Sequence, residues 1–208
     1  MLMLATPQKT CATCIHLVRH GAHDELGWVL SGRAGAIPLN EEGCRQAAAL
    51  SRWARQENIS AVYTSPRART LETASVIAAA AELQIEIAPE LDEVDFGMWN
   101  GKAFAELSED PLWQRWNDSR ATAATPGGET MVEAIDRGTG FLHSLAETQP
   151  GGTFLCVTHC DIIRGMIAHY LGLSFDNLLK FDIQPGSIST VLLGPSGGRV
   201  TRLNEVPA

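Results

Sequence analysis

Two short apolar runs in this chain each end abruptly at a cluster of polar residues. Residues 14–18 lead into Arg19-His20-Gly21, and residues 153–158 lead into His159-Cys160-Asp161. Runs of this length predict buried strands of a sheet. Because the chain leaves a strand at its carboxyl end, we expect both polar clusters in loops at the edge of that sheet.

Segments with helical periodicity separate the predicted strands. Asn40 can cap a helix that extends to about residue 56, since its side chain can accept a hydrogen bond from the first turn. Further helices are predicted over residues 67–81, 129–146 and 160–171. Further strands are predicted near residues 61–63, 85–88, 178–183 and 187–193.

The alternation of strands and helices predicts an α/β fold. Parallel strands need crossover helices, so we expect a three-layer α/β/α sandwich with a mostly parallel sheet. Residues 91–128 break the periodicity and predict a small cap of short helices and loops, packed by Trp99, Trp113 and Trp116. We expect a single domain over residues 1–208, with a loose tail at residues 1–10.

Composition narrows the class of function. With 208 residues, 45% of them hydrophobic and 19% charged, the chain is typical of one globular domain. The net charge of −8 argues against nucleic acid as a partner, because a nucleic-acid surface needs a basic face. An anionic substrate would therefore need a local cluster of positive side chains.

The cysteines and the absence of long apolar runs predict the compartment. Five cysteines form an odd set without the spacing of a secreted scaffold, which favours a reducing, cytoplasmic setting. No signal peptide and no membrane-spanning run are expected. Cys11 and Cys14 could form half of a metal or redox site, but Cys14 falls in a predicted buried strand, so we expect no metal.

Five segments carry polar residues in a recognisable order. They are Leu17-Val18-Arg19-His20-Gly21, Ser65-Pro66-Arg67-Ala68-Arg69-Thr70-Leu71-Glu72-Thr73-Ala74, Leu91-Asp92-Glu93-Val94-Asp95-Phe96-Gly97-Met98-Trp99, Pro126-Gly127-Gly128-Glu129, and Val157-Thr158-His159 followed by Ile163-Arg164. Together they resemble the motifs of the histidine phosphatase superfamily, the phosphoglycerate-mutase-like enzymes. The resemblance covers nearly the whole chain after the tail.

The resemblance implies catalytic roles for five side chains. His20 would carry the phosphoryl group, and Arg19, Arg69 and His159 would bind the phosphate together with it. Glu93 would be the proton donor. The implied activity is a phosphatase that hydrolyses small phosphomonoesters through a phosphohistidine intermediate, on a phosphoglycerate mutase-like fold and without a cofactor. A small phosphorylated metabolite is the expected partner.

The residue types suit that chemistry. Arg19 and Arg69 stay charged, and each guanidinium group can donate hydrogen bonds to two phosphoryl oxygens at once. Neutral His20 can attack phosphorus. Glu93 must be protonated to serve the leaving alcohol, so we expect burial or the phosphate to raise its pKa. The helix predicted after His159 would add backbone N–H groups.

Each of these residues also has an ordinary structural interpretation. Taken alone, Arg19 could be a buried ion-pair partner, Arg69 an exposed helix residue, and Glu93 a solvated loop carboxylate. Their joint placement after strand ends favours the functional interpretation. His16 is expected to be structural and His23 to face solvent in its loop.

The chain departs from the family pattern at three places. Leu26 and Gly27 stand where the family has a polar loop residue, Asn100 replaces a frequent Glu, and Cys160 replaces a Gly. The departures put one phosphate contact in doubt, and a thiol at position 160 could make activity sensitive to oxidation.

Three functions therefore compete: the phosphatase, a cofactor-dependent phosphoglycerate mutase, and a catalytically silent phosphate-binding module. The short segment 102–125 favours hydrolysis over the mutase, and the proton donor Glu93 argues against a silent module. The motifs do not determine the substrate. The oligomeric state is not determined either, and a homodimer is compatible with the sequence.

Overall fold

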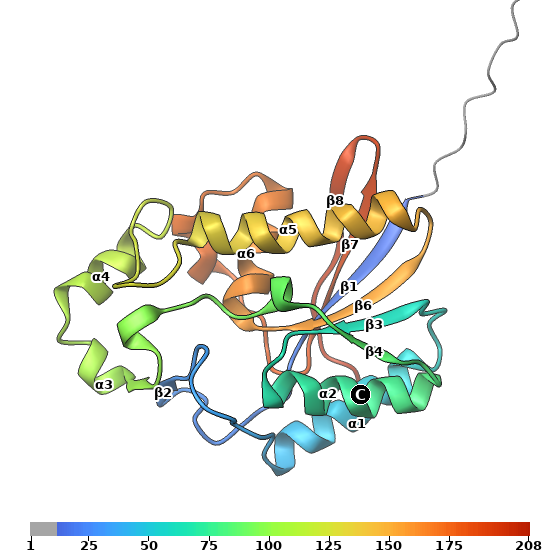
Figure 1. Ribbon diagram of the computed structural model, residues 1–208, viewed down its shortest axis with the longest axis horizontal. Helices are drawn as coiled ribbons and strands as arrows, with labels where there is room; N and C mark the ends of the chain where they lie inside the picture. Colours follow the sequence, from blue (N-terminus) through green and yellow to red (C-terminus); the bar gives the residue numbers. More distant parts are fainter. Residues whose placement is uncertain (1–11) are drawn as a thin grey trace, which may run out of the picture.

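The computed structural model describes residues 12–208 and places a six-stranded sheet at the centre of the protein (Figure 1). The predicted tail and Cys11 lie outside the described residues. The strand order is β4-β3-β6-β1-β7-β8. The strands are β1 (Thr13–Arg19), β3 (Ala61–Thr64), β4 (Ile85–Ile87), β6 (Thr153–Thr158), β7 (Ile188–Gly194) and β8 (Gly197–Glu205). β4, β3, β6 and β1 run parallel to one another, β7 pairs antiparallel with β1, and β8 pairs antiparallel with β7.

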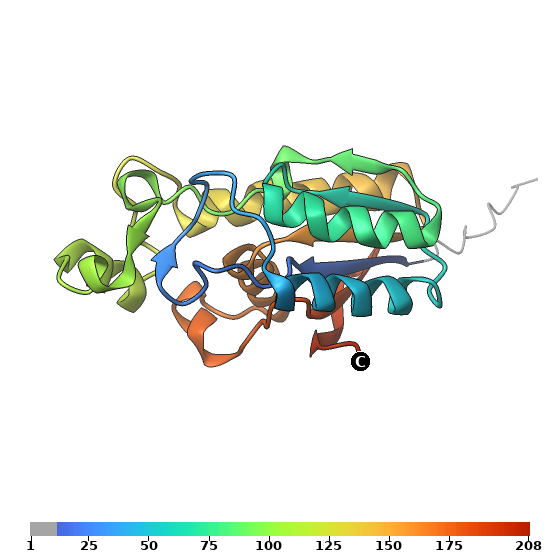
Figure 2. The same ribbon diagram turned by 90° about the horizontal axis from the view of Figure 1, so that it is seen from below.

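Four long helices cover the two faces of the sheet, as Figures 1 and 2 show. α1 (Glu41–Ala54) and α2 (Ala68–Ala81) lie on one face, and α5 (Met131–Thr148) and α6 (Cys160–Leu171) lie on the other. Asn40 caps α1 as predicted, because its side chain accepts a hydrogen bond from the Gly43 N–H at 2.9 Å. The predicted three-layer α/β/α fold is confirmed.

Alternation along the central strands divides the core between the two faces. In β6, Phe154 and Cys156 face the α5 and α6 side, whereas Leu155 and Val157 face the α1 and α2 side. Successive side chains of a strand point to opposite faces, so a strand buried on both faces is a continuous apolar run. This is the pattern from which β6 was predicted.

A smaller group of elements lies beyond the carboxyl ends of the parallel strands, at the left in Figure 1. It contains the short strand β5 (Lys102–Ala103) and the helices α3 (Phe104–Leu107) and α4 (Pro111–Asp118), and β5 pairs with β2 (Val29–Leu30). Three 3-10 turns complete the described elements: η1 (Pro89–Leu91), η2 (Gly97–Trp99) and η3 (Phe175–Lys180). Trp99 and Trp116 are buried here with their rings 6.4 Å apart, so these tryptophans pack this region as predicted.

The prediction for the C-terminal part was wrong in two places. Residues 178–183 form no strand: η3 (Phe175–Lys180) occupies the first part, with Ser174 accepting a hydrogen bond from the Asp176 N–H at 3.2 Å. The last strand, β8, was not predicted. Its exposed positions carry Arg199, Arg202 and other polar residues, because β8 is the edge strand of the sheet, and this hides the apolar signal.

The loop after β1 and the start of α1 approach each other so closely that only glycine fits. A Cβ atom on Gly43 would lie 2.1 Å from the Ala22 carbonyl oxygen, and one on Gly21 would lie 2.6 Å from the Gly43 carbonyl oxygen. Both obstacles are backbone atoms, which cannot rotate away. The close approach holds the segment that follows His20.

We expect Gly43→Ala to destabilise the protein by about 2 kcal/mol or more, because the new methyl group forces the two backbones apart. Thermal unfolding followed by circular dichroism measures the change. Gly140 in α5 is the matched control, since a Cβ there meets nothing within 4 Å. Gly140→Ala should raise stability by about 1 kcal/mol, as alanine is the better helix former. Equal effects of the two substitutions would contradict the close approach.

Candidate active site

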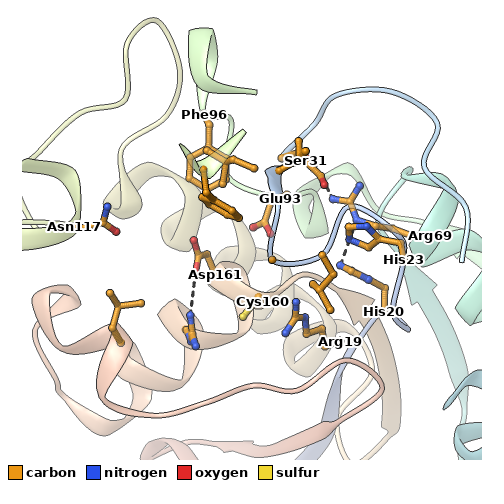
Figure 3. A pocket seen from close by; sticks show the side chains of 18 of the residues that line it. Arg19, His20, His23, Ser31, Arg69, Glu93, Phe96, Asn117, Cys160 and Asp161 are labelled. Carbon is orange, nitrogen blue, oxygen red and sulfur yellow. Dashed lines mark hydrogen bonds and ion pairs between the residues drawn. The ribbon is translucent and has the colours of Figure 1, made fainter. Parts of the chain in front are cut away.

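A cavity of about 440 Å³ opens beyond the carboxyl ends of β1 and β6 (Figure 3). The two strands are neighbours in register, with Arg19 paired to Thr158. Four of the five predicted site residues line this cavity: Arg19, His20, Arg69 and Glu93. Ligands of parallel α/β sheets bind at this edge because loops from neighbouring strands meet there.

His20 is buried beside the end of β1, and its ring has one defined tautomer. Nδ1 lies 2.8 Å from the Gly21 carbonyl oxygen, which can only accept a hydrogen bond, so Nδ1 carries the proton. Nε2 accepts a hydrogen bond from the Arg69 Nε at 3.3 Å. Burial, and then the charges of Arg69 and Arg19, hold the pKa of His20 well below its usual value. The ring is therefore neutral, and Nε2 keeps a lone pair.

Two arginines near His20 each keep a donor that has no acceptor within residues 12–208. Arg69 comes from the first turn of α2 and is 2% exposed, and Arg19 ends β1. Arg69 Nη2 donates to the Gly32 carbonyl oxygen at 2.7 Å, and Arg19 Nη1 donates to the Ile183 carbonyl oxygen at 2.6 Å. Arg69 Nη1 and Arg19 Nε have no acceptor among the described residues. Arg69 is buried and Arg19 is half-buried, and guanidinium groups with spare donors in such a setting favour an anion as ligand.

His159, the fifth predicted residue, lies behind Arg69 and does not line the cavity. Its ring is fully buried and 5.3 Å from the His20 ring between centroids. Nδ1 accepts from Arg69 Nη2 at 3.0 Å, so Nε2 carries the proton and donates to Ser65 Oγ at 2.8 Å. Ser65 in turn donates to Asp92 at 3.2 Å. The chain of hydrogen bonds orients Arg69, and a contact of His159 with phosphate stays a prediction.

Glu93 is a buried carboxyl group that faces the cavity across from His20 (Figure 3). Its Oε1 accepts a hydrogen bond from the Val94 N–H at 3.0 Å. Burial, and then the negative charge of Asp161, raise the pKa of Glu93 to about 7. Arg69 and Arg19 oppose this shift. A carboxyl group with this pKa can both give and take a proton near neutral pH.

A network of ion pairs holds the loop that carries Glu93. The Asp92 carboxylate takes two parallel hydrogen bonds from Arg67, at 2.9 Å and 2.6 Å. Arg33 donates to the Glu93 carbonyl oxygen at 2.8 Å and to Glu129 at 2.8 Å. These supporting residues were not singled out from the sequence, although Arg67, Asp92 and Glu129 lie within the recognised motifs.

The structure contradicts the expectation for His23, whereas the oxidation sensitivity suggested for Cys160 stays a prediction. His23 does not face solvent: it is 5% exposed, lines the cavity, and its ring lies 5.4 Å from the His20 ring between centroids. Burial and the charge of Arg69 lower the pKa of His23 to about 4, so the ring is neutral. Cys160 also lines the cavity, but burial raises the pKa of its thiol to about 11. A protonated thiol reacts slowly with oxidants, so its surroundings do not favour the expected sensitivity.

Sequence reasoning missed the polar residues at the other side of the cavity. Asn117 and Arg120 come from the end of α4 and the turn after it, and Asp161 and Arg164 come from the start of α6. Only Arg164 stood within a recognised motif. Asp161 belonged to the polar cluster predicted after residues 153–158, whereas Asn117 and Arg120 had no sequence signal that places them beside it.

No helix within residues 12–208 has the length and apolar character needed to cross a membrane.

The fold and the cavity together define an α/β protein with a cavity suited to an anion, with arginines and neutral histidines at the carboxyl ends of parallel strands. Comparison with known families agrees with this class of protein. The family model of the histidine phosphatase superfamily, branch 1, matches residues 15–206. The chain belongs to this superfamily.

Relatives within the family carry names of both phosphatases and mutases. The chain is 28% identical over 193 residues to phosphoserine phosphatase 1 of Hydrogenobacter thermophilus, covering 90% of each chain. It is 31% identical over 182 residues to a probable phosphoglycerate mutase GpmB of Cronobacter sakazakii, covering 85% of this chain and 83% of the relative. It is also 34% identical over 204 residues to bifunctional protein Rv2228c of Mycobacterium tuberculosis, where 95% of this chain spans 55% of the relative.

Solved structures show the same fold. A mycobacterial glucosyl-3-phosphoglycerate phosphatase superposes with a TM-score of 0.84 at 21% identity, over 93% of this chain and 99% of the other. The predicted class of activity, a phosphoric monoester hydrolase, is confirmed at the level of the family, and the mutase alternative has less support.

The raised pKa of Glu93 predicts how stability depends on pH. The folded protein binds this proton more tightly than the unfolded chain does, so the stability it contributes is complete below about pH 4.5 and is lost as pH rises towards 7. Glu93→Gln removes the titration. We therefore compare the difference in melting temperature, Glu93→Gln minus the unmodified protein. We expect this difference to be larger at about pH 8 than at about pH 5.

The exposed residue Glu86 provides the control, because Glu86→Gln removes a charge without removing a buried carboxyl group. A Glu93→Gln shift that is the same at both pH values would show that the carboxyl group is not held protonated by burial.

Proposed function

We propose that this protein hydrolyses small phosphomonoesters in two steps, through a phosphoryl group carried on Nε2 of His20. The observation that carries the proposal is the state of His20. The Gly21 carbonyl oxygen holds the proton on Nδ1, so Nε2 is unprotonated and accepts a hydrogen bond from Arg69 Nε in a residue that lines the cavity. A neutral imidazole in this state is a competent nucleophile.

In the first step, Nε2 attacks phosphorus and the bond from phosphorus to the ester oxygen breaks. Arg19 and Arg69 balance the charge on the equatorial oxygens with donors that find no acceptor in the described part of the chain. Glu93 gives its proton to the departing alcohol. The raised pKa of Glu93 supports this role, because a carboxyl group at its ordinary pKa would hold no proton near neutral pH.

In the second step, water attacks phosphohistidine and phosphate leaves. Glu93, now ionised, accepts the proton of that water, and Nε2 recovers its lone pair. His159 supports both steps by orienting Arg69 through the 3.0 Å hydrogen bond to Nη2. The first turn of α6, which begins at Cys160 beside the cavity, adds the positive end of a helix dipole.

The names of relatives suit a small phosphorylated metabolite as substrate. Phosphoserine and glucosyl-3-phosphoglycerate are named for one relative and one structural neighbour, respectively. The cavity of about 440 Å³ is much larger than one phosphoryl group, so it can hold the alcohol part as well.

We expect His20→Ala to lose phosphatase activity by about a thousandfold or more, because no nucleophile remains behind phosphorus. Release of p-nitrophenol and of phosphate from p-nitrophenyl phosphate measures this. His169→Ala is the matched control, since His169 is exposed on α6. The purified protein, quenched during turnover, should also carry an acid-labile phosphoryl group that His20→Ala lacks.

Full ester cleavage by His20→Ala would refute the proposal. A catalytically silent module would release no phosphate even without substitution. A mutase would instead return the phosphoryl group to phosphoglycerate and release little phosphate, so the ratio of isomerised to hydrolysed product distinguishes it from the phosphatase.

The pH profile tests Glu93 as the proton donor. For an alkyl phosphate, kcat/KM should fall as pH rises through the Glu93 pKa of about 7. Asp161→Asn removes a negative charge that raises this pKa, so the falling limb should move to lower pH. p-Nitrophenyl phosphate is the control substrate, because its phenolate leaves without a proton. If Asp161→Asn leaves the falling limb of the alkyl phosphate profile at the same pH, the assignment of Glu93 is wrong.

A further inference from the structure

His23 is a buried imidazole at the cavity to which the proposed steps assign no role. It belongs to the loop between β1 and β2, lines the cavity and is 5% exposed. Figure 3 shows it close to His20 and Arg69. The rings of His20 and His23 lie 5.4 Å apart between centroids and are tilted by 38°. His23 therefore lies at the end of the cavity that holds the proposed nucleophile.

Nδ1 of His23 is buried and has no hydrogen-bond partner among the residues that the structure describes. A buried polar atom in that state costs free energy, so such atoms are normally paired. The two carboxylates of the same loop are engaged elsewhere. Asp24 accepts a hydrogen bond from Asn40 Nδ2 at 3.2 Å, and Glu25 accepts one from the Ser31 hydroxyl at 2.8 Å. A partner for this nitrogen would therefore come from a ligand.

The backbone on both sides of His23 is held in place. The Ala22 N–H donates to Gln46 Oε1 at 2.8 Å, and the Asn40 N–H donates to the Ala22 carbonyl oxygen at 3.0 Å. The Leu26 N–H donates to the His23 carbonyl oxygen at 3.1 Å. The ring is thus positioned before a ligand binds, so binding costs little conformational freedom.

His23 is also the polar side chain of this loop that remains available to a ligand. Of the residues in 23–32 that line the cavity, all but His23 and Ser31 are apolar residues or glycines. The Ser31 hydroxyl already donates its hydrogen bond to Glu25. If this loop contacts an anion through a side-chain donor, that donor is therefore His23.

The charges around His23 determine which form of its ring a ligand meets. The groups that face it are Arg69 of α2, Arg19 and His20 at the end of β1, and Asp24 and Glu25 of its own loop. Burial, and then the charge of Arg69, lower the pKa of His23 to about 4, so the ring is neutral in the free protein. A phosphoryl dianion beside Arg69 and Arg19 would offset their charge and favour the imidazolium form.

We propose that His23 is a further ligand of the phosphoryl group, which donates a hydrogen bond from its ring to a phosphoryl oxygen and takes up a proton from water as the dianion binds. The inference rests on the proposed function, because it assumes that the phosphoryl group binds at His20. The imidazolium adds a positive charge to those of Arg19 and Arg69 while charge builds on the equatorial oxygens. When phosphate leaves, the proton returns to water.

The protonation state of His23 tests the proposal directly. Sulfate is the probe, because it remains a dianion near neutral pH, and the ¹⁵N NMR shifts of the histidine rings are the readout. At about pH 6 the free protein should show a neutral His23 ring. With sulfate at concentrations that inhibit hydrolysis, both ring nitrogens should carry a proton. His23→Phe identifies the His23 signals by their loss.

Substitution of His23 separates a hydrogen bond from packing. His23→Phe keeps a ring but has no donor, so kcat/KM for p-nitrophenyl phosphate should fall by about tenfold or more, the effect of one charge-assisted hydrogen bond. Inhibition by sulfate should weaken by a similar factor. His23→Asn and His23→Gln place an amide N–H near the positions of Nδ1 and Nε2, and at least one of them should recover most of the loss.

The same exchange at an exposed histidine is the matched control. His169→Phe replaces a solvent-facing imidazole on α6 and should leave kcat/KM and sulfate inhibition unchanged. Thermal unfolding shows whether each variant is folded. If His23→Phe does not fold, His23→Asn identifies the NMR signals, and the response of the unmodified protein to sulfate decides.

The outcomes separate this inference from the proposed function. If the unmodified protein does not hydrolyse p-nitrophenyl phosphate, the proposed function is wrong. If it hydrolyses the ester but sulfate leaves the His23 ring neutral, the inference is wrong while the proposed function stands. The same holds if His23→Phe behaves like His169→Phe, or if neither amide variant recovers activity, because His23 would then only fill space.

Discussion

The parallel pairing of β1 with β6 is the constraint on which the site depends. It places Arg19 in register with Thr158, so the next residues, His20 and His159, leave the sheet side by side. The two residues are far apart in the sequence, and only the register brings them together. A shift by one residue would turn one of the two strands over and send its following side chain to the other face of the sheet.

Burying positive charge at this point requires a compensating network behind it. Arg69 is anchored through His159 and Ser65 to Asp92, and Asp92 is in turn held by Arg67. His159 and Ser65 each accept one hydrogen bond and donate another in this chain. In a low-dielectric setting such hydrogen bonds are strong and unpaired groups are costly. Burial, and then the charge of Arg69, lowers the pKa of both His20 and His159, which links the electrostatics of the anchor to the chemistry of the nucleophile.

The cavity also has a charge opposite to that of the molecule as a whole. The chain carries a formal net charge of −8, yet Arg19, Arg69, Arg120 and Arg164 all line one cavity. Concentrating cations in a partly enclosed site focuses the field there, so an anion is attracted by the cavity although the remaining surface repels it. Glu93 keeps its proton in this setting because burial outweighs the nearby arginines.

The sequence by itself determined the order of most elements and five residues of the proposed site, because short apolar runs, an Asn cap and the motif spacing are local signals. The edge strand β8 was not predicted, because most of its positions are exposed and carry few apolar residues in a regular pattern. Burial of His23 and the meeting of Arg120 with Asp161 were decided only by tertiary structure. Both depend on which segments pack together in the fold, and neither residue type nor spacing along the chain encodes those contacts.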